Sequence, residues 1–353
     1  MTGRVFPAFA AQPTGLPSGL SPADRALDLA LRRATVIIFA AVLLYFGLQA
    51  PAFLGQENLG NIVKQSAFIG IAAIGITFVL LTAGIDLSVG SVMYLAPLIA
   101  GFVMRDTGVG VAGGMAAAVA AGAVLGGINA IFIVGLSIIP FIVTLATLFA
   151  FRGFGAFLTS SRQFDFPPAI RDFGLAAIGG IPVPVIAFGL VALAAHLVLT
   201  RTTFGRQVYA VGNDPAGAVK AGIPVARIRG VAYVISGAAA GLAGFVLIAQ
   251  IGRLDAGFGQ GREFDVIAAA VLGGASLFGG VGTALGAVVG ATLMQTVNTG
   301  LAFTGVNLYL QPLLQGGIIF LAVLVDSLRQ ARQAMRRRRT IRPLQVLSRD
   351  GST

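Results

Sequence analysis

Apolar runs long enough to cross a lipid bilayer recur along this sequence. Charged residues make up only 10% of the chain, against roughly 25% in soluble domains. A spanning helix needs roughly 20 mostly apolar residues, so the pattern predicts an all-α polytopic membrane protein with about ten transmembrane helices, some of them short or broken. The candidate spans are Ala34–Ala50, Ile62–Leu81, Val89–Val103, Val109–Leu136, Pro140–Leu158, Ile181–Leu199, Gly230–Gln250, Val266–Leu277, Gly282–Leu301 and Leu313–Val325.

The positions of the basic residues predict the orientation. Arg and Lys concentrate in cytoplasmic segments of membrane proteins, so the Arg-rich loop 201–229 should be cytoplasmic and the charge-balanced loops 160–180 and 251–265 should lie outside. The net charge of +11 comes from segments that flank apolar runs and therefore indicates no nucleic-acid partner. The expected organisation is a cytoplasmic N-terminal tail over 1–32, a single transmembrane domain over 33–326 and a basic cytoplasmic C-terminal tail over 327–353.

One polar stretch, Thr82–Ser91, interrupts the apolar pattern early in the chain. It carries Asp86, Ser88 and Ser91 between the runs Ile62–Leu81 and Val92–Val103. A carboxylate close to hydrocarbon is usually functional or faces a polar cavity. The stretch predicts a broken membrane segment, which survives at membrane depth only against protein or water. The alternative is a helix–turn–helix at the membrane surface with Asp86 as an N-cap.

A few other polar side chains within the apolar runs are candidates for a transport path. Hydroxyls and amides hydrogen-bond neutral polyols well, although a Ser or Thr in a helix more often bonds a carbonyl of its own helix. Asn129 and Asn298 are the stronger candidates, because an unsatisfied buried amide is costly. The expected path residues are Asp86, Ser88, Ser91, Asn129, Thr144, Thr147 and Asn298, with Gln295 beside them.

Small residues spaced four apart predict close helix packing in lipid. The pairs are Gly122/Gly126, Gly237/Gly241 and Gly286/Gly290, which also arise by chance in a Gly-rich chain. The short, Gly-interrupted stretch Val266–Thr283 in the second half resembles Thr82–Ser91 in the first. Such pairs of segments point to a site between inverted repeats.

The energy source for any transport is not encoded in this chain. A phosphate-binding P-loop needs Gly-Lys-Ser/Thr, and the two lysines lie in Val-Lys64-Gln and Val-Lys220-Ala. With no Cys and a single His we expect no metal site, no cofactor and no catalytic residue. The favoured interpretation is an energy source on another chain. The alternatives are an ion-coupled secondary sugar carrier that uses Asp86, and a membrane-embedded enzyme, which the scattering of 13 acidic residues disfavours.

The loop 201–229 contains a short helix with start and stop signals. Asn213 or Asp214 can cap it, Pro215 suits its first turn, and Gly222 suits the position after its end. We therefore expect a helix over Pro215–Ala221 that is exposed to the cytoplasm.

Several of these stretches together resemble the permease subunit of ribose-type bacterial sugar ABC importers, over residues 50 to 326. Thr82–Ser91 is the most diagnostic of them. Two positions depart from the family pattern, because Ala83 and Asn213 stand where a second Gly is common. The matching stretches are TAGIDLSVGS (82–91), TFGRQVYAVGN (203–213), AGI (221–223), FDVIAAAVLGG (264–274) and GGVGT (279–283).

The resemblance implies a fold akin to vitamin B12-type importer permeases and a multi-pass protein of the bacterial inner membrane. It implies a pore of two permease subunits, identical or closely related. It also implies an ABC ATPase, commonly with two fused nucleotide-binding halves, and a periplasmic sugar-binding protein. The loop 201–229 would carry the coupling helix that the ATPase moves. The implied coupling residues are Gly205, Asn213, Asp214, Pro215, Ala218, Lys220, Ala221 and Gly222.

Overall fold

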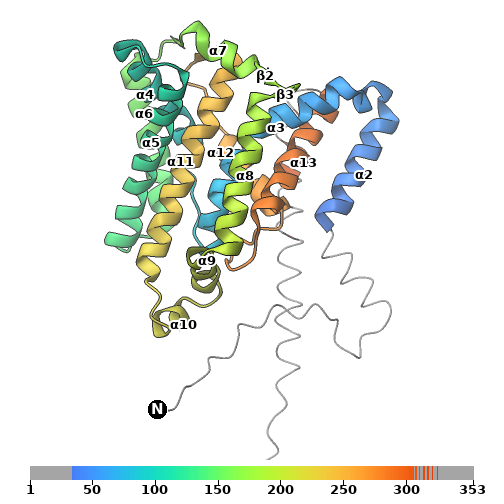
Figure 1. Ribbon diagram of the computed structural model, residues 1–353. Helices are drawn as coiled ribbons and strands as arrows, with labels where there is room; N and C mark the ends of the chain where they lie inside the picture. The colour runs from blue at the N-terminus through green and yellow to red at the C-terminus, as the bar shows by residue number, and fades with distance from the viewer. Residues whose placement is uncertain are drawn as a thin grey trace, which may run out of the picture.

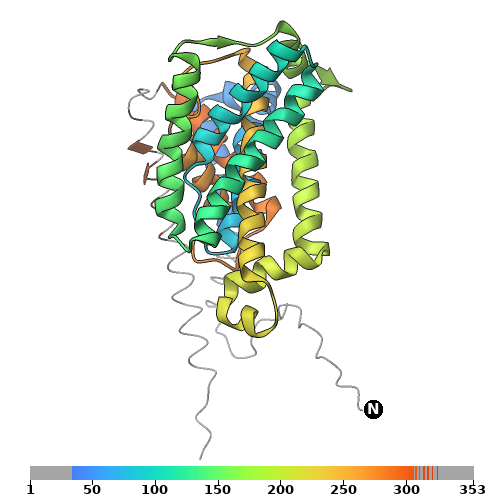
Figure 2. The same ribbon diagram turned by 90° about the vertical axis from the view of Figure 1, so that its left-hand side faces the viewer.

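The computed structural model describes residues 34–305 and, after them, residues 307, 310, 313, 314, 316, 317, 320 and 324. Long helices run between two ends of a bundle (Figure 1). One end carries α7 and the short strands β2 and β3, and the other carries α9 and α10. Figure 2 shows the same separation after a quarter turn. Both predicted tails, 1–32 and 327–353, lie outside the described residues.

The helices of the first half are α2 (Ala34–Gln49), η1 (Pro51–Leu54), α3 (Gln56–Leu81), α4 (Val89–Thr107), α5 (Val111–Ala130), the π-helical turn η2 (Ile131–Gly135) and α6 (Pro140–Thr159). Those that follow are α7 (Pro168–Leu175), α8 (Val183–Arg201), α9 (Thr203–Asn213), α10 (Pro215–Lys220), α11 (Val225–Ile251), α12 (Arg262–Leu272) and α13 (Ala284–Phe303). The strands are β1 (Phe164–Asp165), β2 (Ala177–Ile178), β3 (Ile181–Pro182) and β4 (Arg253–Leu254).

Within the described residues, six helices are long and apolar enough to cross a membrane: α3, α4, α5 with η2, α6, α8 and α11. The all-α membrane class is therefore confirmed, but a count of ten crossings is not. The predicted span Val266–Leu277 is corrected to α12, an 11-residue helix of roughly 16 Å. The predicted span Leu313–Val325 lies largely outside the described residues.

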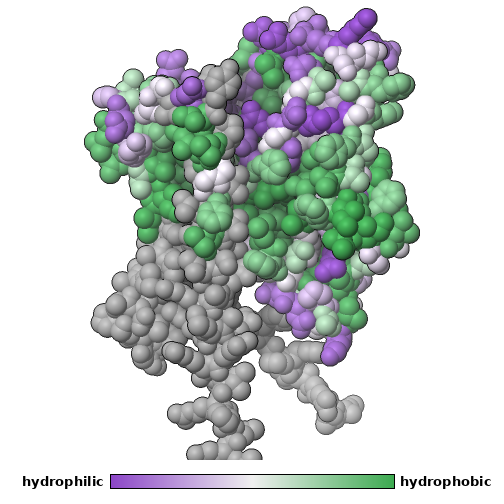
Figure 3. Space-filling view, turned by 180° about the vertical axis from the view of Figure 1, so that it is seen from behind, coloured by the Kyte–Doolittle hydropathy of each residue, from purple (hydrophilic) through white to green (hydrophobic). Residues whose placement is uncertain are grey.

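The centre of the bundle is built on α3. Its residues from Ser66 to Leu81 are all buried, as expected for a helix that is apolar on every face. α11, α13, α12 and α8 surround it. The outer helices keep large apolar side chains exposed, among them Phe149, Phe157 and Leu190. On the face seen in Figure 3, apolar residues form a hydrophobic belt between two polar ends, which suits contact with lipid or with another membrane subunit.

Two of the glycine pairs pack against each other, as the sequence predicts. A Cβ on Gly122 would collide with the carbonyl of Gly237, and a Cβ on Gly237 would collide with the carbonyl of Gly122. Gly126 and Gly241 continue this seam between α5 and α11. The pair Gly286/Gly290 faces α12 in the same way. Small residues thus bring helix backbones together where a side chain has no room.

Two broken segments enter the bundle from opposite ends and meet inside it. Residues 82–88 lead to α4, and residues 255–261 lead to α12. The first turn of α12 lies at mid-bundle, because the Arg262 guanidinium is 5.5 Å from the ring of Phe68, near the middle of α3. There Glu263 and the carbonyl of Gly259 lie against Gly90 of α4. The predicted outer loop 251–265 is therefore corrected, because its last residues begin a buried helix.

The two charge-balanced loops lie at the same end of the molecule, as predicted. β1 pairs antiparallel with β4, with Phe164 opposite Leu254 and Asp165 opposite Arg253. β2 and β3 form a second short hairpin beside α7. This end lies away from α9 and α10, so the two sets of loops are on opposite sides of the hydrophobic belt.

Candidate functional site

The carboxylate of Asp86 lies at the centre of a buried polar network. Asp86 is only 1% exposed. Its Oδ1 accepts hydrogen bonds from the backbone N–H of Ser88 at 3.0 Å and from Ser88 Oγ at 2.6 Å. Its Oδ2 accepts from Ser236 Oγ of α11 at 2.8 Å. Three donors thus stabilise a group that would otherwise be expensive to bury.

The network continues from Ser88 to α5 and α6. Asn129 Nδ2 donates to Ser88 Oγ at 2.7 Å, and Thr147 Oγ1 lies 2.7 Å from Asn129 Oδ1, to which it donates. Asn129 precedes the π-helical turn η2, a distortion that is frequent at functional sites. A chain of polar groups therefore joins α11, the 82–88 bend, α5 and α6.

The other predicted path residues are more dispersed. Ser91 donates to the carbonyl of Ser88. Thr144 Oγ1 donates within its own helix to Pro140, at 3.0 Å, and lies 3.4 Å from the carbonyl of Ile85. Asn298 lies on α13, where Gln295 donates to Gln65 of α3 at 2.9 Å. The structure thus brings Asp86, Ser88, Asn129 and Thr147 into one network, with Thr144 at its edge, and leaves Asn298 on a different helix.

Two members of the network were missed from the sequence. Ser236 is a lone hydroxyl in an apolar run, and Tyr233, one turn before it, donates to the carbonyl of Ile85 at 3.2 Å. The position directly before α4 is held by Ser88, which makes no side-chain cap, rather than by Asp86. Asp86 instead closes a turn onto Ser88 and α11. No group of His and acidic side chains able to hold a metal is found among the described residues.

The predicted short helix is present in the loop 201–229. Asp214 caps α10 by accepting from the N–H of Gly217 at 3.0 Å. At its end, Gly222 has φ +76°, its N–H donates to Val219, and the N–H of Ile223 donates to Ala218. These two bonds form a Schellman motif. A cap at each end makes this six-residue helix a defined element on the surface.

The same loop holds a second helix that was not predicted. Thr202 caps α9 by accepting from the N–H of Gly205 at 3.1 Å. Gly205 lets α9 approach the last turn of α8, because a Cβ there would meet the carbonyls of Val198 and Leu199. Asn213 ends α9 and donates to the carbonyl of Tyr209 at 2.8 Å. Pro215, Lys220, Ala221 and Gly222 are exposed, whereas Ala218 is buried against the bundle.

α9 touches the loop that leads to α4 and the loop that follows α12. Gly212 lies against the carbonyl of Leu81 and the N–H of Gly280, which are themselves joined by a 3.0 Å hydrogen bond. Tyr209 donates its hydroxyl to the carbonyl of Gly282 at 2.8 Å. Burial raises the pKa of this phenol, so the donor stays protonated. A displacement of α9 therefore acts on the loops before α4 and after α12.

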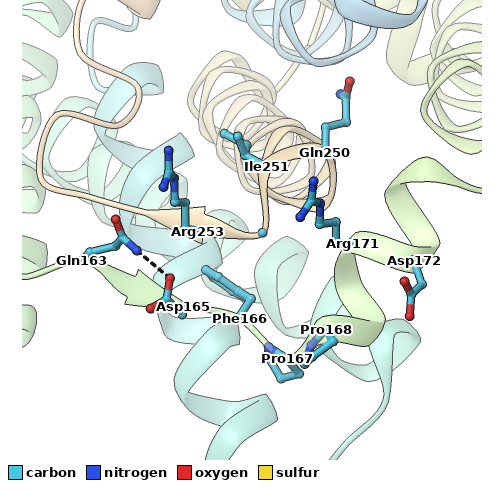
Figure 4. Close-up of a pocket in the computed structure, with 11 residues that line it drawn as sticks. Gln163, Asp165, Phe166, Pro167, Pro168, Arg171, Asp172, Gln250, Ile251 and Arg253 are labelled. Carbon is cyan, nitrogen blue, oxygen red and sulfur yellow. Dashed lines mark hydrogen bonds between the residues drawn. The ribbon is translucent and has the colours of Figure 1, made fainter.

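The opposite end of the molecule has a polar pocket of about 730 Å³ between β1, β4, α7 and the end of α11. Arg171 and Arg253 line it together with Asp165 and Asp172 (Figure 4). Gln163 donates to Asp165 at 2.7 Å. The pocket presents charges of both signs at an exposed surface, as a protein–protein contact does.

Comparison with known proteins gives a consistent assignment. The profile of a permease family described as "Branched-chain amino acid transport system / permease component" matches residues 58–323. The chain belongs to this family. It is 37% identical to the ribose import permease protein RbsC of Escherichia coli (strain K12) over 286 residues, which cover 80% of this chain and 89% of the relative.

Two further relatives support the assignment. The D-allose transport system permease protein AlsC of Escherichia coli (strain K12) is 36% identical over 83% of this chain and 91% of its own length. The galactose/methyl galactoside import permease protein MglC of Salmonella typhimurium is 34% identical over 84% of this chain and 94% of its own length. No solved structure matches the chain significantly. The protein is thus a multi-pass permease of the inner membrane and not an enzyme.

Proposed function

We propose that this chain is the pore-forming subunit of an ATP-driven importer of a monosaccharide, a pentose, a hexose or a related polyol. The observation that carries the proposal is the match of at least 80% of the chain to permeases named for ribose, allose and galactose. The network around Asp86 consists largely of hydroxyl and amide groups, which suit neutral polyols. Cargo of this class accounts for these groups better than a charged amino acid does.

The proposed energy source is a separate ABC ATPase, with two nucleotide-binding halves in one chain, docked on α10. ATP-driven transport by a chain without a P-loop needs such a partner. The capped helix α10 offers it a rigid contact, with Gly205, Asn213, Asp214, Pro215, Ala218, Lys220, Ala221 and Gly222 as coupling residues. In this proposal the α9–α10 end faces the cytoplasm, and the basic residues of the two tails predict the same side for both termini.

The proposed coupling route runs from α10 through α9 to the 82–88 bend and to the 273–283 loop after α12. Movement of α10 would shift Gly212 against Leu81 and Tyr209 against Gly282. These contacts lie at the base of the 82–88 bend and of the 273–283 loop. A push there changes the positions of α4 and α12, whose first turns meet at mid-bundle. The path would open around Asp86, Ser88, Ser91, Asn129, Thr144, Thr147 and Asn298.

At the other end, the pocket at Arg171 and Arg253 is the proposed docking surface of a periplasmic sugar-binding protein. Its mixed charges would orient that protein above the bundle. A second permease subunit, a copy or a close paralogue, would cover part of the exposed apolar belt.

The test is purification of the permease from native membranes in mild detergent, followed by identification of the co-purifying chains. The proposal predicts a stoichiometric P-loop ATPase, and ATP-dependent uptake of ribose, allose or galactose after reconstitution. Gly222→Val should abolish uptake while the permease still inserts, because its φ of +76° excludes a β-branched residue. Uptake without ATP that a protonophore stops would instead establish an ion-coupled carrier.

A further inference from the structure

Three buried side-chain atoms in the described residues have no hydrogen-bond partner: Tyr94 Oη, Arg152 Nη2 and Glu263 Oε2. Tyr94 is fully buried and Glu263 is 6% exposed. Unpaired buried polar atoms are rare in folded proteins, and each one calls for a ligand, a water or another specific cause. None of the three belongs to the network around Asp86.

The three side chains lie at one place in the bundle. Gly90 and Tyr94 are one turn apart on the same face of α4. Glu263, in the first turn of α12, has Oε2 against Gly90. Arg152 of α6 has its guanidinium carbon 5.9 Å from the centre of the Tyr94 ring and within electrostatic range of Glu263. The cluster therefore lies between α4, α6 and α12, where the two broken segments meet.

The turn before α12 packs over the cluster and is bonded to Arg152. Arg152 Nη1 donates to the carbonyl of Phe258 at 3.1 Å, with the carbonyl of Ala256 at 3.4 Å. The carbonyl of Gly259 lies against Gly90. Gly259 and Gly261 have φ of +72° and +78°, so the turn is hinged on two glycines. Nη1 of the guanidinium thus bonds the turn before α12, while Nη2 is left without a partner.

The unpaired groups specify the chemistry of a partner that would satisfy all of them. Arg152 and Tyr94 offer donors and Glu263 offers an acceptor. No ion pair joins Arg152 to Glu263 in the part of the chain that the structure describes, although Glu263 is buried and Arg152 is half-buried beside it. An anion would meet the Glu263 carboxylate, and a cation would meet the guanidinium. A neutral group that both accepts and donates satisfies all three, and hydroxyls do so.

We propose that Tyr94, Arg152 and Glu263 form an enclosed site that binds a pair of adjacent hydroxyls of the transported sugar. One hydroxyl accepts from Arg152 and Tyr94, and the neighbouring one donates to Glu263. The inference rests on the proposed function as a sugar importer. Ordered water has the same hydrogen-bonding chemistry, so the test must separate water from sugar.

The test compares sugars with their deoxy analogues in vesicles that hold the full complex, with one and the same binding protein throughout. Labelled D-ribose, D-allose and D-galactose are measured first, and the sugar moved fastest is then compared with its monodeoxy analogues. In the unmodified protein, one analogue should move about tenfold more slowly than the parent sugar, the effect of one lost hydrogen bond. In Tyr94→Phe, uptake of the parent sugar should slow about tenfold. The ratio of its uptake rate to that of the deoxy analogue should then shrink to about twofold.

Glu263→Gln is the second variant. It retains the shape of the side chain but replaces a charged acceptor by a neutral one, so discrimination at the adjacent hydroxyl should weaken. Tyr45→Phe is the matched control, since Tyr45 lies exposed on α2, and it should change neither ratio. If uptake slows in both variants but the ratios of parent to deoxy-analogue uptake stay unchanged, the three side chains hold only an ordered water. That result would overturn the proposed sugar site. If the unmodified complex moves none of the three sugars, the proposed function fails first and the inference fails with it.

Discussion

The hydroxyl of Ser236 donates to Oδ2 of Asp86 across 2.8 Å, although 150 positions separate the two residues. This bond ties the middle of α11 to the bend that precedes α4. Ser88 supplies the two donors on the other carboxylate oxygen. The position of the bend in the bundle therefore depends on hydroxyl groups from two different segments.

Ser236→Ala should lower the free energy of unfolding by about 1–3 kcal/mol, because Asp86 Oδ2 would be left buried without its donor. Unfolding of the purified protein in detergent, followed by circular dichroism, measures the loss. The control is Ser66→Ala, whose equally buried hydroxyl donates only to Val63 in its own helix. Equal losses in the two variants would show that the bond to Asp86 adds nothing.

Members of the polar network could be predicted from sequence only where a polar side chain interrupts an apolar run and has no common local partner. Asp86, Ser88, Asn129 and Thr147 stand out in apolar runs, and the structure joins them. Ser236 did not stand out, because an isolated helical Ser usually bonds a carbonyl of its own helix. Asn298 stood out equally well but lies on α13. Which helix faces which is decided by packing between distant segments, and the periodicity of one run does not contain that information.

Gly237→Ala should destabilise the protein by about 1–3 kcal/mol, because its Cβ would press on the carbonyl of Gly122 at the α5–α11 seam. Denaturant unfolding, or the yield of folded protein after mild heating, gives the effect. Gly189→Ala is the control, since that exposed glycine of α8 has nothing within 4 Å of an added Cβ. There the helix should gain about 0.5–1 kcal/mol. A tolerated Ala at Gly237 would mean that the seam is looser than described.

Helix positions were easiest to predict where an apolar run is bounded by proline or by polar residues that end a helix. The expected span Pro140–Leu158 differs from α6 by one residue. α12 was placed too late, because Glu263 and Asp265 looked like part of a polar loop. They lie instead in the first turn of the helix, where the macrodipole favours acidic groups. Its burial at mid-bundle follows from the broken segments meeting there, which a single run of sequence does not reveal.

Ala83→Gly should stabilise the protein by about 1 kcal/mol. Ala83 has φ +59°, a left-handed conformation that is unfavourable for every residue with a Cβ. The strain is local and lies at the base of the 82–88 bend. Thermal unfolding compares the variant with Ala41→Gly, in which an exposed alanine of helix α2 is replaced and about 1 kcal/mol should be lost. A loss in both variants would contradict a strained Ala83.

Val219→Asp tests the proposed contact between α10 and an ATPase. Val219 is 62% exposed on a helix that Asp214 and Gly222 hold at both ends. An apolar side chain on so short and rigid an element suits a protein interface better than solvent. A carboxylate buried there without a partner should weaken association at least tenfold.

The measurement is the amount of ATPase retained on the tagged permease, with the elution volume of the permease in size-exclusion chromatography as the check on folding. Ile178→Asp makes the same change at a 66% exposed residue at the opposite end, and it should retain the ATPase. Full retention by Val219→Asp, or equal losses in both variants, would place the ATPase elsewhere.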